Sequence, residues 1–331
     1  MTVGIALVGC GLIGEKRART LSPARLVVCA DAKLACAERL ARGHQDCIAT
    51  DDWRRVMEND SVEAVIVATP HHLLVPIASA AIDASKHVLI EKPGARHPDE
   101  LRPLIGAAKR KGVVVRVGFN HRYHPAFRKA RAMVDEGAVG SLMFLRCRYG
   151  HGGRIGYDRE WRARPEISGG GELIDQGMHV IDLARWFLGD FLKVQGFAAT
   201  FYWDMPVDDN AFLLLRTAED RTAFLHASCT EWKNTFSFEL YGREGKLQVD
   251  GLGGSYGTER LTWYRMLPQM GPPETTIWEY PMADDSWSAE ILEFIEDIRL
   301  RRKSTPSLED AVAALEIVSK IYKDSGYDHR A

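Results

Sequence analysis

The sequence predicts an α/β protein in which a doubly wound parallel sheet is followed by an α+β domain with a large, mainly antiparallel open sheet. Its 331 residues are enough for about two domains. Short apolar runs alternate with amphipathic stretches up to about residue 118, as in parallel sheets with helical crossovers. Several strand-like runs then follow without helices between them. We therefore expect domains at 1–123 and 124–331.

The apolar runs of the first half are expected to be strands covered on both faces, because most of them are continuously hydrophobic. The amphipathic stretches between them are expected to be helices. The predicted strands are 4–8, 25–29, 64–68, 87–90 and 113–117, and the predicted helices are 14–22, 33–42, 72–85 and 98–112.

The second half begins with a predicted helix at 124–136 and a strand at 141–149, followed by a polar loop rich in Gly and Arg. One long helix is expected from Gly171 to Gly189. Strands are then expected at 193–202, 210–217, 221–230, 235–242 and 245–250. Two helices, 286–302 and 307–324, close the chain, with Ser307 as the N-cap of the second.

Composition excludes several classes of protein. Hydrophobic residues make up 46% and charged residues 27% of the chain, which is ordinary for a globular protein and argues against long disorder or a coiled coil. Residues 1–150 carry a net charge of +8 and the rest −10, but the basic residues are scattered, so we expect no nucleic-acid partner. No segment approaches the ~18 apolar residues that a membrane helix needs. With no basic leader before the first apolar run, we expect a cytoplasmic protein.

The six cysteines form no C-x-x-C pair and no zinc-like spacing with histidine. We therefore expect no metal site. Buried thiols in a reducing compartment are the favoured interpretation.

A glycine-rich turn follows the first predicted strand directly, with Gly9, Gly11 and Gly14 in the order G-x-G-x-x-G. In a strand-turn-helix context such a turn lets a dinucleotide pyrophosphate approach the backbone at the helix N-terminus, as in a Rossmann fold. Asp31 ends the second strand, where a carboxylate meets the adenosine ribose. This carboxylate favours NAD over NADP, although Lys33 lies nearby. A site for another nucleotide, or for none, is the alternative.

Three further motifs give the chain a family resemblance: Glu91-Lys92-Pro93, the run from Gly118 to Phe127, and the run from Gly169 to Asp182. With the glycine turn, they resemble the Gfo/Idh/MocA family of glucose-fructose and inositol oxidoreductases over nearly the whole chain. The resemblance implies hydride transfer between nicotinamide and a carbon of a sugar, cyclitol or nucleotide-sugar. It also implies a homodimer or homotetramer formed through the second-domain sheet.

The resemblance assigns catalytic roles to Lys92, Asp175 and His179. One departure occurs after Pro70, where His71 stands in place of the Asn that relatives often have, in the loop expected near the nicotinamide. The expected cofactor contacts are Gly9, Gly11, Leu12, Ile13, Gly14, Asp31, Thr69, Pro70, His72, Glu91 and Lys92.

Elementary chemistry is consistent with these roles. Oxidation of a secondary alcohol needs a base, and the histidine pKa is naturally near neutrality, so we expect His179 to be that base. Lys92 would polarise the reacting oxygen, and Asp175 would orient the substrate or tune the other two. On an α-helix Asp175, His179 and Asp182 form one polar stripe. The alternative for this stripe is a solvated helix edge.

Five arginines between residues 148 and 164 suggest an anionic substrate, because Arg suits forked recognition of phosphate or carboxylate. Pairing of these arginines with nearby acids or with a neighbouring subunit is equally consistent. The expected substrate contacts are Asn120, Arg122, His124, Arg154, Tyr157, Trp161 and Arg162.

Two other functions stay open. Some relatives retain NAD and use transient oxidation to cleave a glycosidic bond, which would make the protein a hydrolase. A non-catalytic dinucleotide sensor would need the glycine turn but not Lys92 together with His179.

Overall fold

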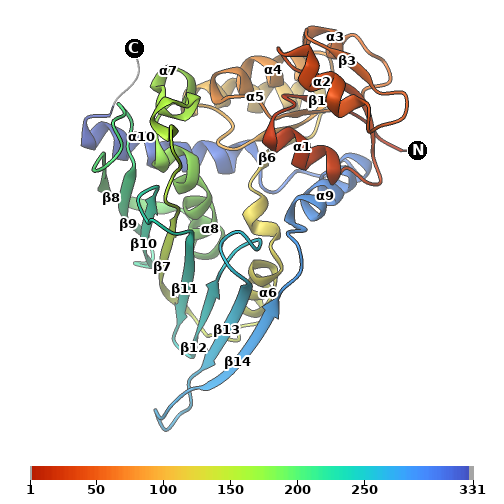
Figure 1. Cartoon of the computed structure of the whole chain (residues 1–331). Helices are drawn as coiled ribbons and strands as arrows, with labels where there is room; N and C mark the ends of the chain where they lie inside the picture. Colours follow the sequence, from red (N-terminus) through yellow and green to blue (C-terminus); the bar gives the residue numbers. More distant parts are fainter. Residues whose placement is uncertain (1, 328–331) are drawn as a thin grey trace. The chain divides into compact units, whose positions relative to one another are not determined.

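The computed structural model describes residues 2–327 and divides them into two compact units (Figure 1). The first contains the chain up to Phe119 together with Trp287–Leu315, and the second contains Asn120–Ser286 and the chain from Glu316 onwards. The first unit is therefore built from two separate stretches of the chain. From the sequence we expected a single domain boundary, after residue 123, and did not include the second stretch. Segment 287–315 belongs there because its acidic residues Glu290 and Asp297 pair with buried arginines of that unit.

The first unit contains a fully parallel six-stranded sheet in the order β3-β2-β1-β4-β5-β6, which is the Rossmann order. The predicted parallel sheet is confirmed, and only its short edge strand β3 was not predicted. Three residues carry too little periodicity to be read as a strand. The strands are β1 (Gly4–Val8), β2 (Arg25–Ala30), β3 (Ile48–Thr50), β4 (Ala64–Val67), β5 (His87–Glu91) and β6 (Val115–Gly118).

Buried aliphatic side chains of the central strands form one core with the closing helix of this unit. Ile5, Leu7 and Ile66 pack in the same cluster as Ile291 and Phe294, all fully buried. Burial of each such side chain stabilises the fold by roughly 1.5–3 kcal/mol. The helices are α1 (Leu12–Arg19), α2 (Leu34–Ala41), the unpredicted α3 (Arg54–Met57), α4 (His71–Asp83), α5 (Pro98–Lys111) and α9 (Ser286–Leu300), of which all but the first residue of α9 belong to this unit.

The second unit is built on an eight-stranded sheet in the order β14-β13-β12-β11-β7-β10-β9-β8 (Figure 1). Neighbouring strands are antiparallel except for the parallel pair of β7 and β10, so the predicted mainly antiparallel sheet is confirmed. The last two strands were not predicted. The strands are β7 (Leu142–Gly150), β8 (Phe191–Ala199), β9 (Asn210–Thr217), β10 (Thr222–Ser228), β11 (Thr235–Gly242), β12 (Gly245–Asp250), β13 (Glu259–Arg265) and β14 (Glu274–Tyr280).

One face of this sheet is covered by helices. Helix α8 (Met178–Leu188) packs on β7 and β10, and α6 (Pro125–Asp135) packs on β12, β13 and β14. Strand β11 accordingly alternates between buried and half-buried residues. The remaining helices are α7 (Pro165–Ser168), α10 (Leu308–Ser325), which crosses from one unit to the other, a π-helical turn at Leu173–Gly177, and 3-10 turns at Asn120–Tyr123, Tyr157–Arg159 and Trp161–Ala163.

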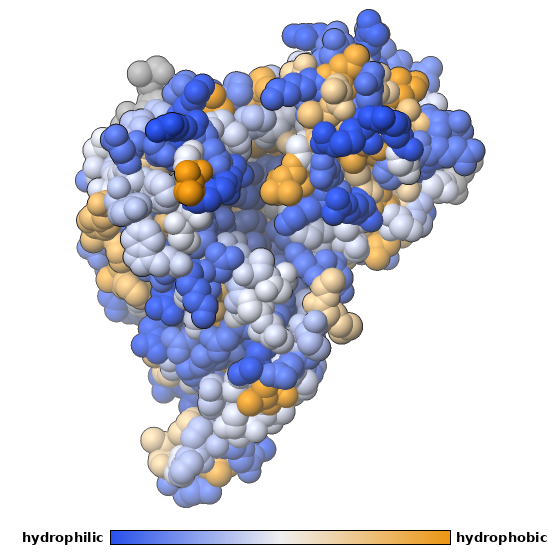
Figure 2. All heavy atoms as spheres, in the orientation of Figure 1, coloured by the Kyte–Doolittle hydropathy of each residue, from blue (hydrophilic) through white to orange (hydrophobic). Residues whose placement is uncertain are grey.

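The surface in the view of Figure 2 is mostly hydrophilic, with hydrophobic residues in small, separate groups. No helix within residues 2–327 is long and apolar enough to cross a membrane.

Candidate active site

The glycine turn between β1 and α1 uses its three glycines differently. Gly9 has a φ of +96°, and a Cβ there would lie 2.4 Å from the Ala68 carbonyl oxygen. A Cβ on Gly14 would lie 2.1 Å from the Gly9 carbonyl oxygen. At Gly11, by contrast, no described atom outside the neighbouring residues lies within 4 Å of an added Cβ. The fold therefore requires the outer two glycines, while Gly11 leaves open space at the start of α1, which fits a dinucleotide pyrophosphate.

Asp31 is held at the end of β2 by backbone donors. One carboxylate oxygen accepts a hydrogen bond from the Cys10 amide and the other from the Lys33 amide, each at 2.8 Å. A carboxylate oxygen has two lone pairs, so both oxygens retain acceptor capacity for ribose hydroxyls. The residue thus fits the adenosine contact predicted for it.

Two side chains after β4 have buried polar atoms with no hydrogen-bond partner among residues 2–327: Thr69 Oγ1 and His72 Nδ1. Burial, with a smaller contribution from Arg96, lowers the pKa of His72. These atoms lie where the strand order reverses, since β1 pairs with both β2 and β4. Ligands bind at the carboxyl ends of strands at such switch points, so unsatisfied polar atoms there fit a bound dinucleotide.

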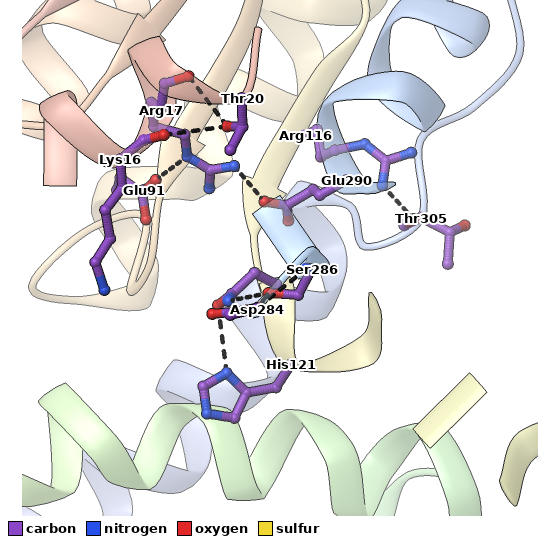
Figure 3. A network of polar contacts seen from close by, with 11 residues as sticks. Lys16, Arg17, Thr20, Glu91, Arg116, His121, Asp284, Ser286, Glu290 and Thr305 are labelled. Carbon is purple, nitrogen blue, oxygen red and sulfur yellow. Dashed lines mark hydrogen bonds and ion pairs between the residues drawn. The ribbon is translucent and has the colours of Figure 1, made fainter. Parts of the chain in front are cut away.

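Glu91, at the end of β5, is committed to a buried ion pair (Figure 3). Arg17 of α1 is fully buried and donates from Nε to Glu91 and from Nη1 to Glu290 of α9, each at 2.6 Å. The Trp287 ring lies 4.5 Å from the same guanidinium. Burial raises the pKa of Glu290, although Arg17 partly opposes the shift. This network anchors the strand end immediately before Lys92.

The predicted helix between Gly171 and Gly189 is confirmed as one unbroken helical segment, but its first part is not α-helical. The chain forms a π-helical turn at Leu173–Gly177 before α8 begins. Close packing at its start explains Gly170 and Gly171, because a Cβ on Gly171 would lie 1.9 Å from the Asp208 carbonyl oxygen. A Cβ on Gly170 would lie 2.3 Å from the Tyr322 hydroxyl. Single π turns of this kind are frequent at functional sites.

Asp208 and Tyr322 hold this turn, and neither was singled out from the sequence. The Asp208 carboxylate accepts hydrogen bonds from the Gly171 amide at 2.9 Å and the Leu173 amide at 2.7 Å. Tyr322 donates its hydroxyl proton to Asp208 at 2.7 Å and accepts from the amides of Gly171 and Ile174. Burial raises the pKa of Asp208 to about 6, against these hydrogen bonds, which lower it. Residues 208 and 322 lie far from the turn in sequence, so no local pattern marks them.

Asp175, His179 and Asp182 are all buried, so the alternative of a solvated helix edge is wrong. The His179 ring stacks on His121 of the first 3-10 turn, with centroids 3.7 Å apart and planes 17° apart. His121 was not among the predicted site residues. It lies inside the Asn120–His124 motif, of which only Asn120, Arg122 and His124 were predicted as substrate contacts. Its place in that motif was the one indication in the sequence.

The two carboxylates of the stripe each pair with a predicted substrate-binding arginine. Arg122 donates to both oxygens of Asp182, at 2.8 and 2.6 Å, in a buried bidentate pair. Arg162 donates from Nε to Asp175 at 2.9 Å. Each carboxylate of the stripe is therefore paired with an arginine of the same unit.

Asn120 and His124 are also buried, and their side chains contact other residues of the same unit. Asn120 donates to the Ser286 hydroxyl at 2.9 Å. His124 Nδ1 lies 2.9 Å from Glu259, whose other oxygen accepts from the Ala126 amide. Both side chains thus help to hold the segment that carries His121.

The loop before the π turn mixes exposed and buried residues. Exposed Arg154 forms a bidentate pair with Glu160, at 2.7 and 2.6 Å. Tyr157 is buried and donates to Glu172 at 3.3 Å. Trp161 is half-buried, and the Arg162 guanidinium lies 4.6 Å from its ring. Intramolecular pairing, one of the two interpretations of the arginine-rich loop, accounts for Arg154.

Four of the six cysteines are buried as expected, but Cys36 and Cys47 are half-buried. Within residues 2–327, no cluster of three His, Cys, Asp or Glu side chains could hold a metal ion.

Comparison with known proteins places this geometry in a family. Residues 3–119 match the family described as "Oxidoreductase family, NAD-binding Rossmann fold", and residues 127–248 match the "GFO/IDH/MocA C-terminal domain". A levoglucosan dehydrogenase of Pseudarthrobacter phenanthrenivorans is 29% identical over 74% of this chain and 73% of its own. An inositol 2-dehydrogenase of Rhizobium meliloti is 26% identical over 96% of this chain and 95% of its own.

Among solved structures, a levoglucosan dehydrogenase in complex with NADH and levoglucosan superposes with a TM-score of 0.87. It is 25% identical, and the match covers 99% of this chain and 98% of that one. The glycine turn, the placement of Asp31 and both family matches agree, and the chain is therefore a member of the Gfo/Idh/MocA oxidoreductase family whose first unit is an NAD-binding Rossmann fold.

Proposed function

We propose that this protein is an NAD-dependent dehydrogenase that oxidises a secondary alcohol of a sugar or cyclitol, or reduces the corresponding ketone. The observation that carries the proposal is the buried stripe of Asp175 and His179, held by a π turn in a chain whose other unit binds NAD. The relatives named levoglucosan dehydrogenase and inositol 2-dehydrogenase support the substrate class.

In this proposal His179 is the general base that accepts the hydroxyl proton, and returns it in the reductive direction. Asp175, held by Arg162, orients the substrate hydroxyl. Lys92, directly after the anchored end of β5, polarises the reacting oxygen and stabilises the negative charge that develops on it. Bound NAD supplies the hydride acceptor. The NAD contacts are Gly9, Gly11, Leu12, Ile13, Gly14, Asp31, Thr69, Pro70, His72, Glu91 and Lys92.

An anionic substrate stays a prediction, and the pairing in the arginine-rich loop weakens its support. Arg154 and Arg162 already meet Glu160 and Asp175, so a phosphate or carboxylate would have to compete with these acids. An uncharged polyol would not need to break either pair. We therefore place uncharged sugars and cyclitols ahead of nucleotide-sugars in the proposed substrate order.

The outer face of the eight-stranded sheet supports self-association into a homodimer or homotetramer. Phe224 and Leu214 are opposite each other on β10 and β9, and both are exposed. Phe197 on the neighbouring strand β8 is also exposed. Apolar side chains gathered on an uncovered sheet face are commonly buried in an interface between copies.

A screen for NADH formation tests the function. The protein is incubated with NAD and a panel of cyclitols, neutral sugars, sugar phosphates and nucleotide-sugars, and absorbance of NADH is followed. NAD reduction with a cyclitol or sugar supports the dehydrogenase. Release of free sugar from a glycoside without NADH accumulation would instead identify the hydrolase, and turnover of none of these by protein that binds NADH would favour the sensor.

A further inference from the structure

A pair of sulfur atoms lies beside the NAD-binding turn. Cys29 is fully buried on β2, and Cys47 directly precedes the edge strand β3. Their Sγ atoms are 3.7 Å apart, which is van der Waals contact between sulfurs. Both lie on the side of the sheet where Ala37 and Ala41 of α2 pack. The two thiols therefore face each other between adjacent strands.

Cys47 is the member of this pair that solvent reaches. It is half-buried and lines a surface pocket of about 480 Å³. The charged and titratable residues of the same pocket are Glu38, Arg42, His44 and Asp46. A peroxide must reach the sulfur that it oxidises, so the partly exposed thiol of the pair is the one that reacts first.

The pKa shifts of the two thiols agree with Cys47 being the thiol that reacts first. Hydrogen bonding to Cys10 and Cys47, together with burial, raises the pKa of Cys29. The hydrogen bond from Cys29 lowers the pKa of Cys47. Cys47 is thus the more easily ionised thiol, and Cys29 holds its proton.

Cys29 is also connected to the backbone that binds the dinucleotide. The next residue, Ala30, accepts hydrogen bonds through its carbonyl from the Gly9 amide at 2.8 Å and from the Cys10 thiol at 3.5 Å. The following residue is Asp31, which accepts from the Cys10 amide. A displacement of Cys29 along β2 would therefore reach both the glycine turn and the ribose-binding carboxylate.

We propose that Cys47 and Cys29 form a peroxide-sensitive dithiol whose oxidation to a disulfide weakens NAD(H) binding. The Cys47 thiolate attacks one oxygen of hydrogen peroxide, the O–O bond breaks, and a sulfenic acid and hydroxide form. The Cys29 sulfur then attacks the Cys47 sulfur, the S–O bond breaks, and water leaves with the Cys29 proton. The hydroxide takes up the proton that the Cys47 thiol released on ionisation, so two thiols lose two electrons and one peroxide becomes two waters. Bridging shortens the sulfur separation from 3.7 Å to about 2.05 Å, which draws the two cysteines, and in this proposal the strand β2 that carries Cys29, toward each other.

The test treats the full-length protein with a small molar excess of hydrogen peroxide, alkylates the remaining thiols and maps them by peptide mass spectrometry. We expect a Cys29–Cys47 disulfide that a dithiol reductant reverses. NADH fluorescence titration should show a dissociation constant raised about fivefold or more after oxidation, and restored by reduction.

Three variants separate this pair from general thiol oxidation. Cys29→Ser should stop at a sulfenic acid on Cys47 that dimedone traps, and Cys47→Ser should form no disulfide and keep its NADH affinity under peroxide. Cys36→Ser removes the other half-buried thiol and should behave as the parent. A Cys10–Cys29 disulfide, or no disulfide, would overturn the proposed pair, and a Cys29–Cys47 disulfide with unchanged NADH affinity would overturn its effect. Because the readout is NADH binding, these outcomes do not depend on the proposed substrate.

Discussion

The glycine turn of the first unit and the polar stripe of the second use polar groups in different ways. In the first unit, the NAD-binding turn has open space at Gly11, and Thr69 and His72 have buried polar atoms with no hydrogen-bond partner in the described chain. In the second unit, the polar stripe is matched internally, with Asp182 against Arg122 and Asp175 against Arg162. The glycine turn and the segment after β4 therefore rely on backbone and unsatisfied atoms, whereas the polar stripe relies on prearranged charge pairs.

This difference predicts which substitutions should change the stability of the fold and which should change ligand binding or catalysis. Removing one member of a buried charge pair is strongly destabilising, because its partner then stays buried and charged without compensation. An unsatisfied atom costs stability until a ligand satisfies it. Substitutions in buried charge pairs are therefore expected to lower the free energy of unfolding. Substitutions at stacked or unsatisfied groups are expected to weaken ligand binding or lower turnover.

The largest expected effect is on the Arg17 network of the first unit. Arg17→Met should lower the free energy of unfolding by about 3–5 kcal/mol, because Glu91 and Glu290 would remain buried without their cation. Urea denaturation followed by circular dichroism measures it. The matched control is Arg39→Met, which removes an exposed pair with Glu15 in the same unit and should leave the midpoint unchanged. Equal effects of the two variants would contradict the network's role.

The next effect concerns chemistry in the second unit. His179→Ala should lower kcat by about 10²-fold or more, since it removes the proposed general base, while NADH binding is retained. Stopped-flow or steady-state NADH absorbance with the best substrate of the screen measures it. Near-normal turnover in this variant would remove His179 from the mechanism.

Asp208 should connect stability to pH. Asp208→Asn places an amide nitrogen opposite a backbone N–H at the π turn, which should destabilise the protein by roughly 1–3 kcal/mol. Because the folded pKa of Asp208 is raised to about 6, the parent binds this proton more tightly when folded, and its contribution to stability is lost as pH rises from about 4 through 6. The variant should lack that part of the pH dependence in thermal melts. An unchanged pH profile would show that Asp208 stays ionised throughout this range.

The smallest effect is expected at the exposed Arg154–Glu160 pair. Arg154→Gln should change the free energy of unfolding by less than about 1 kcal/mol, since exposed pairs contribute little. If the substrate is uncharged, kcat/KM should also stay within about twofold of the parent. A large loss of kcat/KM confined to anionic substrates would restore the prediction that this loop selects an anion.

Much of the fold was predictable because its signals are local. Continuous apolar runs marked the buried parallel strands, and β11 and β12 were predicted at their observed bounds. Short or weakly periodic elements were missed, namely β3, α3, α7, β13 and β14. The glycine turn of the Rossmann fold was predicted because three glycines and a carboxylate follow a strand-turn-helix spacing that few other structures need.

The sequence by itself determined the fold class, the glycine turn of the Rossmann fold and the family, since each depends on residue types at short, regular spacings. Only the tertiary structure decided how the polar residues are used. It paired Arg122 with Asp182, stacked His121 on His179, and brought Asp208 and Tyr322 to a π turn that the α-helical period did not predict. These contacts join segments tens to more than a hundred residues apart. Their free energy depends on burial and exact geometry, which a linear pattern does not contain.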